Sequence, residues 1–146
     1  MKALLQRVST AQVRVEGRVI SSISKGLLVF LAVERGDSID NCSYLVNKIL
    51  NHRVFPDGKQ HMNLSVQDVQ GEILVVSQFT LAASGKKGNR PDFSNAEEPT
   101  RAKELYLEFI RILDRHKIDV RAGEFGAYME VELVNDGPVT LLLTTK

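Results

Sequence analysis

The fold class depends on one stretch of the sequence, Gly26-Leu27-Leu28-Val29-Phe30-Leu31-Ala32-Val33. Every residue after the glycine is apolar, and a continuous apolar run of this length is typical of a strand buried on both faces. Such a strand lies in the middle of a sheet. The run is also far shorter than the roughly 20 residues that a membrane-spanning helix needs, so we expect no membrane segment.

The segments around this run predict further strands and one helix. Before it, residues 2–16 and 19–24 carry strand-like alternation and are separated by Gly17, which predicts two strands joined by a turn. After it, apolar residues recur at helical spacing over residues 38–51, with Ser38 as a plausible cap. Residues 73–81 then predict another buried strand.

The second half of the chain contains the clearest helix. One apolar stripe runs from Ala102 to Leu113, and Pro99 suits the first turn of such a helix. Residues 84–95 are rich in Gly, Lys, Asn and Pro, which predicts a loop. Two strands are expected in the tail, at 129–133 and 139–145. We therefore expect one domain over residues 1–146 of the α/β (α+β) class, mostly sheet with two helices packed on it.

Composition limits the possible partners and compartments. A chain of 146 residues with 43% hydrophobic and 25% charged residues is an ordinary single globular domain. The formal net charge of +1 means that any nucleic-acid contact must come from a local patch. Cys42 is the only cysteine, and the N-terminal segment has no apolar signal-peptide core. A cytoplasmic protein is expected.

Several kinds of chemistry find no support in the sequence. His52, His61 and His116 lack metal-ligand spacing and there is no cysteine pair, so we expect no metal site. No phosphate-binding glycine motif occurs, so we expect no cofactor. No G-x-S-x-G elbow occurs either. Ser77 and Thr80 have no His or Asp nearby in sequence, although such partners can still be close in space.

Two short strings stand out, and each has an ordinary interpretation. Ser77-Gln78-Phe79-Thr80-Leu81 can be a strand end whose polar residues face water. Asn135-Asp136-Gly137-Pro138-Val139-Thr140 can be a hairpin turn, because Asp-Gly favours hairpins. Pro138 is awkward in a hairpin, since it removes a backbone donor at the start of a strand. It also permits a cis peptide bond at low cost.

At these two strings the sequence resembles the D-aminoacyl-tRNA deacylase family, also known as the D-tyrosyl-tRNA deacylase family. That family is marked by S-Q-F-T-L and N-x-G-P-V-T. The resemblance extends to the opening residues 1–8, to the loop at 88–94 and to Leu105-Tyr106, so it covers essentially the whole chain.

The resemblance implies a homodimer with a β-rich, barrel-like fold that hydrolyses the ester of D-aminoacyl-tRNA or glycyl-tRNA. It implies that the Gly137–Pro138 peptide is cis and that this turn reaches the active site of the partner subunit. Gln78, Phe79 and Thr80 are the expected catalytic residues, with Ser77 in support. The expected chirality filter is formed by Gly137 and Pro138, and the expected tRNA contacts are Lys86, Lys87 and Arg90.

Other functions remain open at the level of sequence. A general small esterase would use Thr80 or Ser77 and would act on esters that lack RNA. A non-catalytic RNA-binding dimer would need stacking aromatic residues on a sheet, yet aromatic residues make up only 6% of the chain. In a purely structural dimer, the Gly137–Pro138 turn would only hold the interface.

Overall fold

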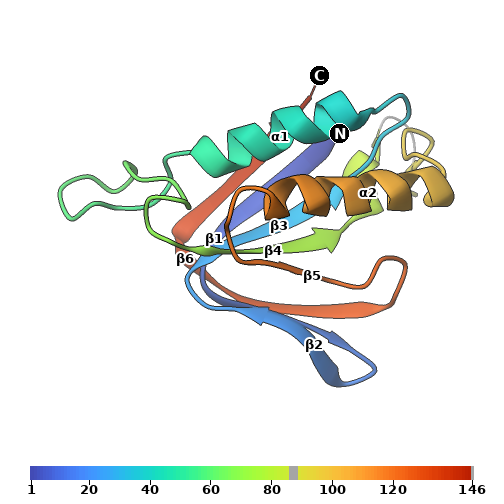
Figure 1. Cartoon of the computed structure of the whole chain (residues 1–146). Coiled ribbons are helices and arrows are strands. Elements are labelled where there is room, and N and C mark those ends of the chain that lie inside the picture. The colour runs from blue at the N-terminus through green and yellow to red at the C-terminus, as the bar shows by residue number, and fades with distance from the viewer. Residues whose placement is uncertain (86–88, 146) are drawn as a thin grey trace.

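The computed structural model of the chain describes residues 1–85 and 89–145, which form two helices and a six-stranded sheet (Figure 1). The elements in chain order are β1 (Lys2–Val15), β2 (Arg18–Ile23), β3 (Gly26–Ala32), α1 (Ile39–Asn51), β4 (Glu72–Ser77), the short 3-10 helix η1 (Phe79–Ala82), α2 (Pro99–Asp114), β5 (Val120–Ala122) and β6 (Met129–Thr144).

The sheet is organised around the long strand β1. On one edge of β1, residues 2–8 pair with β3 and residues 11–15 pair with β2, both antiparallel. On the other edge β6 follows β1 along almost its whole length. Beyond β3 lies β4, which pairs with β3 in parallel, and beyond β4 lies β5, which pairs with β4 in parallel. Because the sheet curls, β2 returns into contact with β4 and β5, which makes a nearly closed, barrel-like sheet.

The apolar run after Gly26 separates two hydrophobic cores, as its sequence predicts. Leu27, Val29 and Leu31 face a large core shared with both helices. Leu28 points to the opposite face, into a smaller core inside the curl of the sheet. A strand buried on both faces has no position for a polar side chain, which explains the unbroken apolar run.

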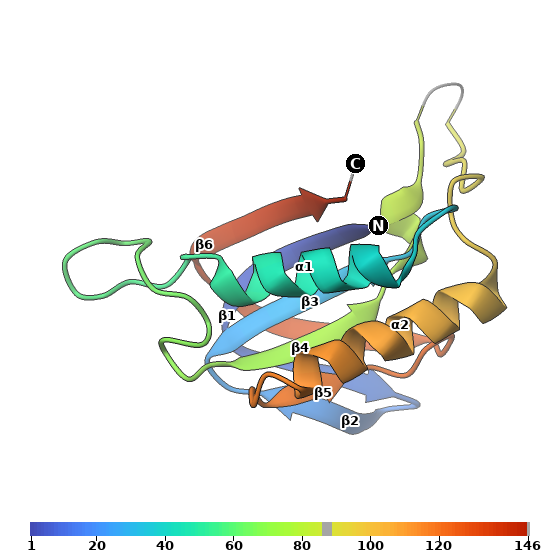
Figure 2. The same cartoon turned by 45° about the horizontal axis from the view of Figure 1, so that its top comes forward.

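Both helices lie side by side on the same face of the sheet (Figure 2). α1 begins after Ser38, whose side chain forms a capping box with Asn41. α2 begins at Pro99, which needs no backbone donor in the first turn. Within the part of the chain that the structure describes, no helix is long and apolar enough to cross a membrane.

The observed strands differ from the predicted strands in three places. The strand expected over residues 73–81 stops at Ser77. The N–H of Gln78 donates the last hydrogen bond of the β3–β4 ladder to the Leu31 carbonyl (2.8 Å), and the chain then turns into η1. The two strands expected in the tail are one strand, β6. The three-residue strand β5 was not predicted.

The hairpin interpretation of residues 135–140 is wrong. In the β1–β6 register, Thr140 lies opposite Gln6 and Asn135 lies opposite Val8. Residues 136–139 therefore bulge out opposite the single residue Arg7, and the strand continues on both sides of this bulge. The Gly137–Pro138 peptide inside it is cis, as the family resemblance implies.

Candidate functional site

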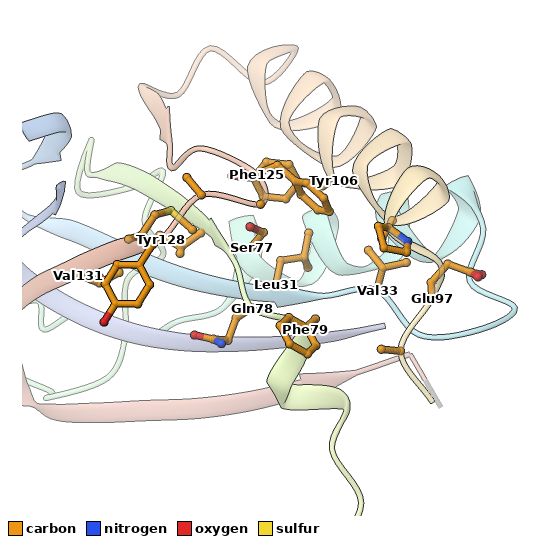
Figure 3. A pocket seen from close by; sticks show the side chains of 17 residues that line it. Leu31, Val33, Ser77, Gln78, Phe79, Glu97, Tyr106, Phe125, Tyr128 and Val131 are labelled. Carbon is orange, nitrogen blue, oxygen red and sulfur yellow. The ribbon is translucent and has the colours of Figure 1, made fainter. Parts of the chain in front are cut away.

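A pocket of about 460 Å³ lies where the carboxyl ends of β3 and β4 meet the beginning of α2. Its third wall is the segment 125–131, which leads into β6. Figure 3 shows Ser77, Leu31, Tyr106 and Phe125 around its centre. The walls are mainly apolar, with few polar side chains, which is typical of a small-molecule site.

The string 77–81 forms one side of this pocket. Ser77, Gln78 and Phe79 line it, whereas Thr80 is exposed on η1 and is not among the lining residues. The side-chain amide of Gln78 donates a hydrogen bond to the Thr80 hydroxyl, which connects the pocket to η1. Of the four residues of the string that were singled out by sequence, three line the pocket and Thr80 lies beside it on η1.

Two backbone donors at the start of η1 have no acceptor within that helix. The N–H of Gln78 donates to the Leu31 carbonyl and the N–H of Leu81 donates to the Gln78 carbonyl. The N–H groups of Phe79 and Thr80 lie before the first helical turn is complete, where intrahelical acceptors do not exist.

Tyr106 on α2 supports the floor of the pocket. The sequence had marked it as part of the apolar stripe and of the family resemblance, but not as a residue of the site. Its hydroxyl donates to the Val75 carbonyl (2.9 Å) and lies 3.3 Å from the Gly123 carbonyl, so it ties the end of β4 to the segment after β5. Burial raises the pKa of the Tyr106 phenol well above its ordinary value, which keeps it a neutral donor.

Residues 84–85 and 89–95 of the expected loop lie next to the pocket. Phe93 packs edge-on against Phe79, with ring centroids 5.1 Å apart. Ser84 and Asp92 exchange two backbone hydrogen bonds, and backbone donation from Ser94 lowers the pKa of the Asp92 carboxyl. Arg90 is exposed in this loop. Of the expected tRNA contacts, Lys86 and Lys87 lie outside the described residues.

The bulge at 136–139 is organised by Arg7, whose side chain is almost completely buried. Its Nε donates to the Asp136 carbonyl (3.0 Å) and also lies 3.2 Å from the Asp136 carboxylate. Its Nη1 donates to the Val54 carbonyl (2.6 Å). Sequence reasoning missed this role, although Arg7 follows Ala3 and Leu5 in the inward-facing alternation of β1, where a charged residue is unexpected.

Asn135 holds the other side of the bulge. Its side-chain oxygen accepts from the backbone N–H of Val139 (3.2 Å), and its amide donates to the Thr140 hydroxyl (2.9 Å). The amide of Gln6 donates to the same hydroxyl (3.2 Å). Residues on both sides therefore fix the backbone around Gly137 and Pro138.

The bulge and η1 lie far apart within one chain. Lys2 donates to the Leu81 carbonyl (3.1 Å), so η1 lies beside the start of β1. The bulge lies beside Arg7, five residues further along the same strand, or roughly 17 Å at about 3.3 Å per residue. The two parts that the family resemblance assigns to one active site are therefore not assembled within a single chain.

Cys42 does not line the pocket, and the residues that the structure describes include no cluster of metal-ligating side chains. Across residues 1–85 and 89–145, no group of three or more His, Cys, Asp or Glu side chains is arranged to hold a metal ion. Cys42 is buried under α2, where its thiol is 3.6 Å from the Leu105 carbonyl. Burial raises the pKa of the Cys42 thiol to about 11, so it stays protonated at neutral pH.

Comparison with known proteins places the chain among deacylases of aminoacyl-tRNA. It is 56% identical to a D-aminoacyl-tRNA deacylase of Magnetococcus marinus over 98% of this chain and 95% of that protein. It is 52% identical to a D-aminoacyl-tRNA deacylase of Thermosipho melanesiensis over 100% of this chain and 98% of that protein.

Two solved structures share the fold. One, described as "c-Myc DNA Unwinding Element Binding Protein", has a TM-score of 0.95 at 43% identity and covers 100% of this chain and 99% of its own. The other, described as a probable eukaryotic D-amino acid tRNA deacylase, has a TM-score of 0.83 at 17% identity over 97% of both chains. The family model described as "D-Tyr-tRNA(Tyr) deacylase" matches residues 4–144. The chain therefore belongs to the D-Tyr-tRNA(Tyr) deacylase family.

Proposed function

We propose that this protein is a D-aminoacyl-tRNA deacylase, which hydrolyses the ester between a D-amino acid and the terminal adenosine of tRNA. Family membership over residues 4–144 carries this proposal. The pocket beside Ser77–Phe79 is the proposed location of the reaction. Glycyl-tRNA is proposed as a second substrate, because glycine has no side chain that a chirality filter can reject.

The pocket suits the nucleoside that all these substrates share. A purine is flat and can pack its faces on apolar side chains, and Phe79 and Phe125 line the pocket together with aliphatic side chains. Ser77 and Gln78 provide hydrogen-bonding groups for the base or ribose. Binding the constant adenosine rather than the variable amino acid would let one site serve many charged tRNAs.

The reaction needs positioned water and a stabilised oxyanion more than a strong nucleophile, because an aminoacyl ester is already activated. The N–H groups of Phe79 and Thr80 are the proposed oxyanion donors. The 2′-hydroxyl of the terminal ribose is the proposed aid to water activation.

Thr80 is proposed to position the substrate rather than attack it. Its hydroxyl accepts a hydrogen bond from the Gln78 amide, and an amide cannot remove a proton. We expect Thr80→Ala to retain deacylation within about tenfold of the wild-type rate, as for loss of one neutral hydrogen bond. Single-turnover rates and mass spectrometry of the quenched enzyme would check this. A folded but inactive variant, or an acyl group trapped on Thr80 of the wild type, would show that Thr80 is the nucleophile.

Chirality is proposed to be read across a homodimer. The carbonyl oxygens of Gly137 and Pro138 of one subunit would accept the ammonium of the D-residue bound at η1 of the other. An L-residue would then direct its side chain into this turn. Two observations support a dimer: the bulge and η1 lie apart in one chain, and β6 leaves Val134 and Leu142 more than half exposed.

The tRNA body is proposed to contact the loop that follows η1. Arg90 is exposed there, and Lys86 and Lys87 are close in sequence. Phosphate contacts of this kind position a substrate without reading its sequence.

Matched esters test the proposed function. D-tyrosyl-tRNA, L-tyrosyl-tRNA and glycyl-tRNA would be incubated with the protein, and loss of the ester would be followed. We expect the D-tyrosyl and glycyl esters to be hydrolysed and the L-tyrosyl ester to survive. Equal hydrolysis of both enantiomers, or of simple esters lacking RNA, would favour a general esterase instead. Binding of tRNA without ester loss would favour a non-catalytic RNA-binding dimer.

A further inference from the structure

Tyr128 lies on the rim of the pocket and its side chain is almost completely exposed. It lines the pocket, yet 90% of its surface is accessible, more than for any other large hydrophobic side chain in the described residues. In Figure 3 its hydroxyl points away from the other labelled residues. A ring that packs on so little contributes little to folding, so its place at the rim requires another explanation.

The backbone that carries Tyr128 is held on both sides. Before it, Phe125 packs against Tyr106 with ring centroids 5.6 Å apart, and the N–H of Ala127 donates to the Glu124 carbonyl (3.2 Å). After it, Met129 begins β6 and packs against the smaller core. The backbone at Tyr128 is therefore held between packed neighbours, and its ring extends from it into solvent.

The chemistry of the rim favours a base over a phosphate. Neighbouring exposed side chains on β6 include Glu130 and Glu132, and an ion pair joins Glu132 to Arg14 (3.3 Å). Carboxylates repel phosphate groups but do not prevent stacking. An exposed aromatic ring is the usual platform for an unpaired base, and such stacking tolerates any base.

We propose that Tyr128 stacks against the cytosine that precedes the terminal adenosine of the tRNA. This inference rests on the proposed function, with the adenosine in the pocket beside Gln78. With the adenosine in this pocket of about 460 Å³, the next base would leave over the rim, and Tyr128 stands on that rim. The 3′ end of a tRNA is single-stranded, so its cytosine is free to stack.

Short D-tyrosyl esters, with and without the cytidine, test stacking on Tyr128 separately from hydrolysis of the ester. The D-tyrosyl esters of adenosine and of cytidylyl-(3′→5′)-adenosine differ only by the cytidine and its phosphate. For the wild type we expect kcat/KM to rise about tenfold when the cytidine is added. Tyr128→Ala should lose this gain and Tyr128→Phe should recover it, because the ring and not the hydroxyl carries the stacking.

Tyr44→Ala is the matched control, because Tyr44 is half exposed on α1 and away from the pocket. Tyr44→Ala should show the same rise in kcat/KM on addition of the cytidine as the wild type. The stacking proposal is overturned if wild type shows no gain, if Tyr128→Ala gains as much as wild type, or if Tyr128→Ala changes the sedimentation of the protein from dimer to monomer. If the wild type hydrolyses no D-tyrosyl ester at all, including D-tyrosyl-tRNA, the proposed function itself fails.

Discussion

Replacing Gly137 by alanine is expected to slow hydrolysis of D-tyrosyl-tRNA by about 100-fold, the cost of misplacing a positioning group by about 1 Å. Gly137 has φ +124°, a conformation that residues with a side chain rarely adopt. An added Cβ would lie 2.6 Å from Nη2 of Arg7 and 3.0 Å from a methyl of Val139. Arg7 cannot move aside easily, since its guanidinium is held by the Val54 and Asp136 carbonyls. The bulge must shift instead, and the proposed ammonium acceptors shift with it.

Gly17→Ala is the matched control for this variant. Gly17 also has a positive φ of +74°, but an added Cβ would meet no atom within 4 Å. It should lose about 1 kcal/mol of stability from backbone strain and keep its activity. Rates of D-tyrosyl-tRNA and glycyl-tRNA deacylation, measured for both variants at a temperature where each is folded, would check this. If Gly137→Ala retained both the wild-type rate and the D-over-L preference, the bulge would be structural and the proposed filter would be wrong.

Gly26→Ala is expected to prevent stable folding, lowering the free energy of unfolding by more than about 4 kcal/mol. An added Cβ would fall onto the carbonyl oxygen of Glu72, and it would lie 2.7 Å from the carbonyl carbon and 2.8 Å from the nitrogen of that residue. These are backbone atoms of the paired strand β4, which cannot rotate out of the way. Relief would require β3 and β4, two inner strands of the sheet, to separate at their starting ends.

Thermal or denaturant unfolding of Gly26→Ala would measure this loss, with Gly85→Ala as the control. Gly85 lies in the loop after η1, and an added Cβ there would meet nothing within 4 Å. Gly85→Ala should unfold at nearly the wild-type midpoint. A Gly26→Ala protein that unfolds cooperatively at a similar midpoint would contradict the steric argument.

The sequence by itself determined the elements whose side-chain patterns are local. The apolar run after Gly26 predicted a strand buried on both faces, and β3 contributes to both cores. The apolar stripe of α2 and its first-turn Pro99 predicted that helix, and the stripe packs on the large core. These elements can be predicted because side chains of a helix or strand return to the buried face at a fixed spacing, whichever elements they pack against.

The end of β4 and the bulge in β6 were decided by tertiary structure. Residues 79–81 continue a strand-like composition, yet they form a 3-10 helix after Gln78 has bonded to Leu31 of a neighbouring strand. Asp136-Gly137 has the composition of a hairpin turn, yet both flanks of it pair with β1. Each outcome depends on a register between segments distant in sequence, and local composition does not encode that register.

The candidate site was likewise determined partly by the sequence and partly by the tertiary structure. The two motifs identified the strings 77–81 and 135–140, but not their surroundings. Only the folded chain brought Tyr106 and the segment 125–131 to Ser77, and buried Arg7 beneath Gly137. A pocket is made by side chains from several elements that approach one another after the sheet has curled, so no single stretch of sequence contains it. The sequence determined which residues were available to the site, and the curl and register of the sheet decided which of them meet.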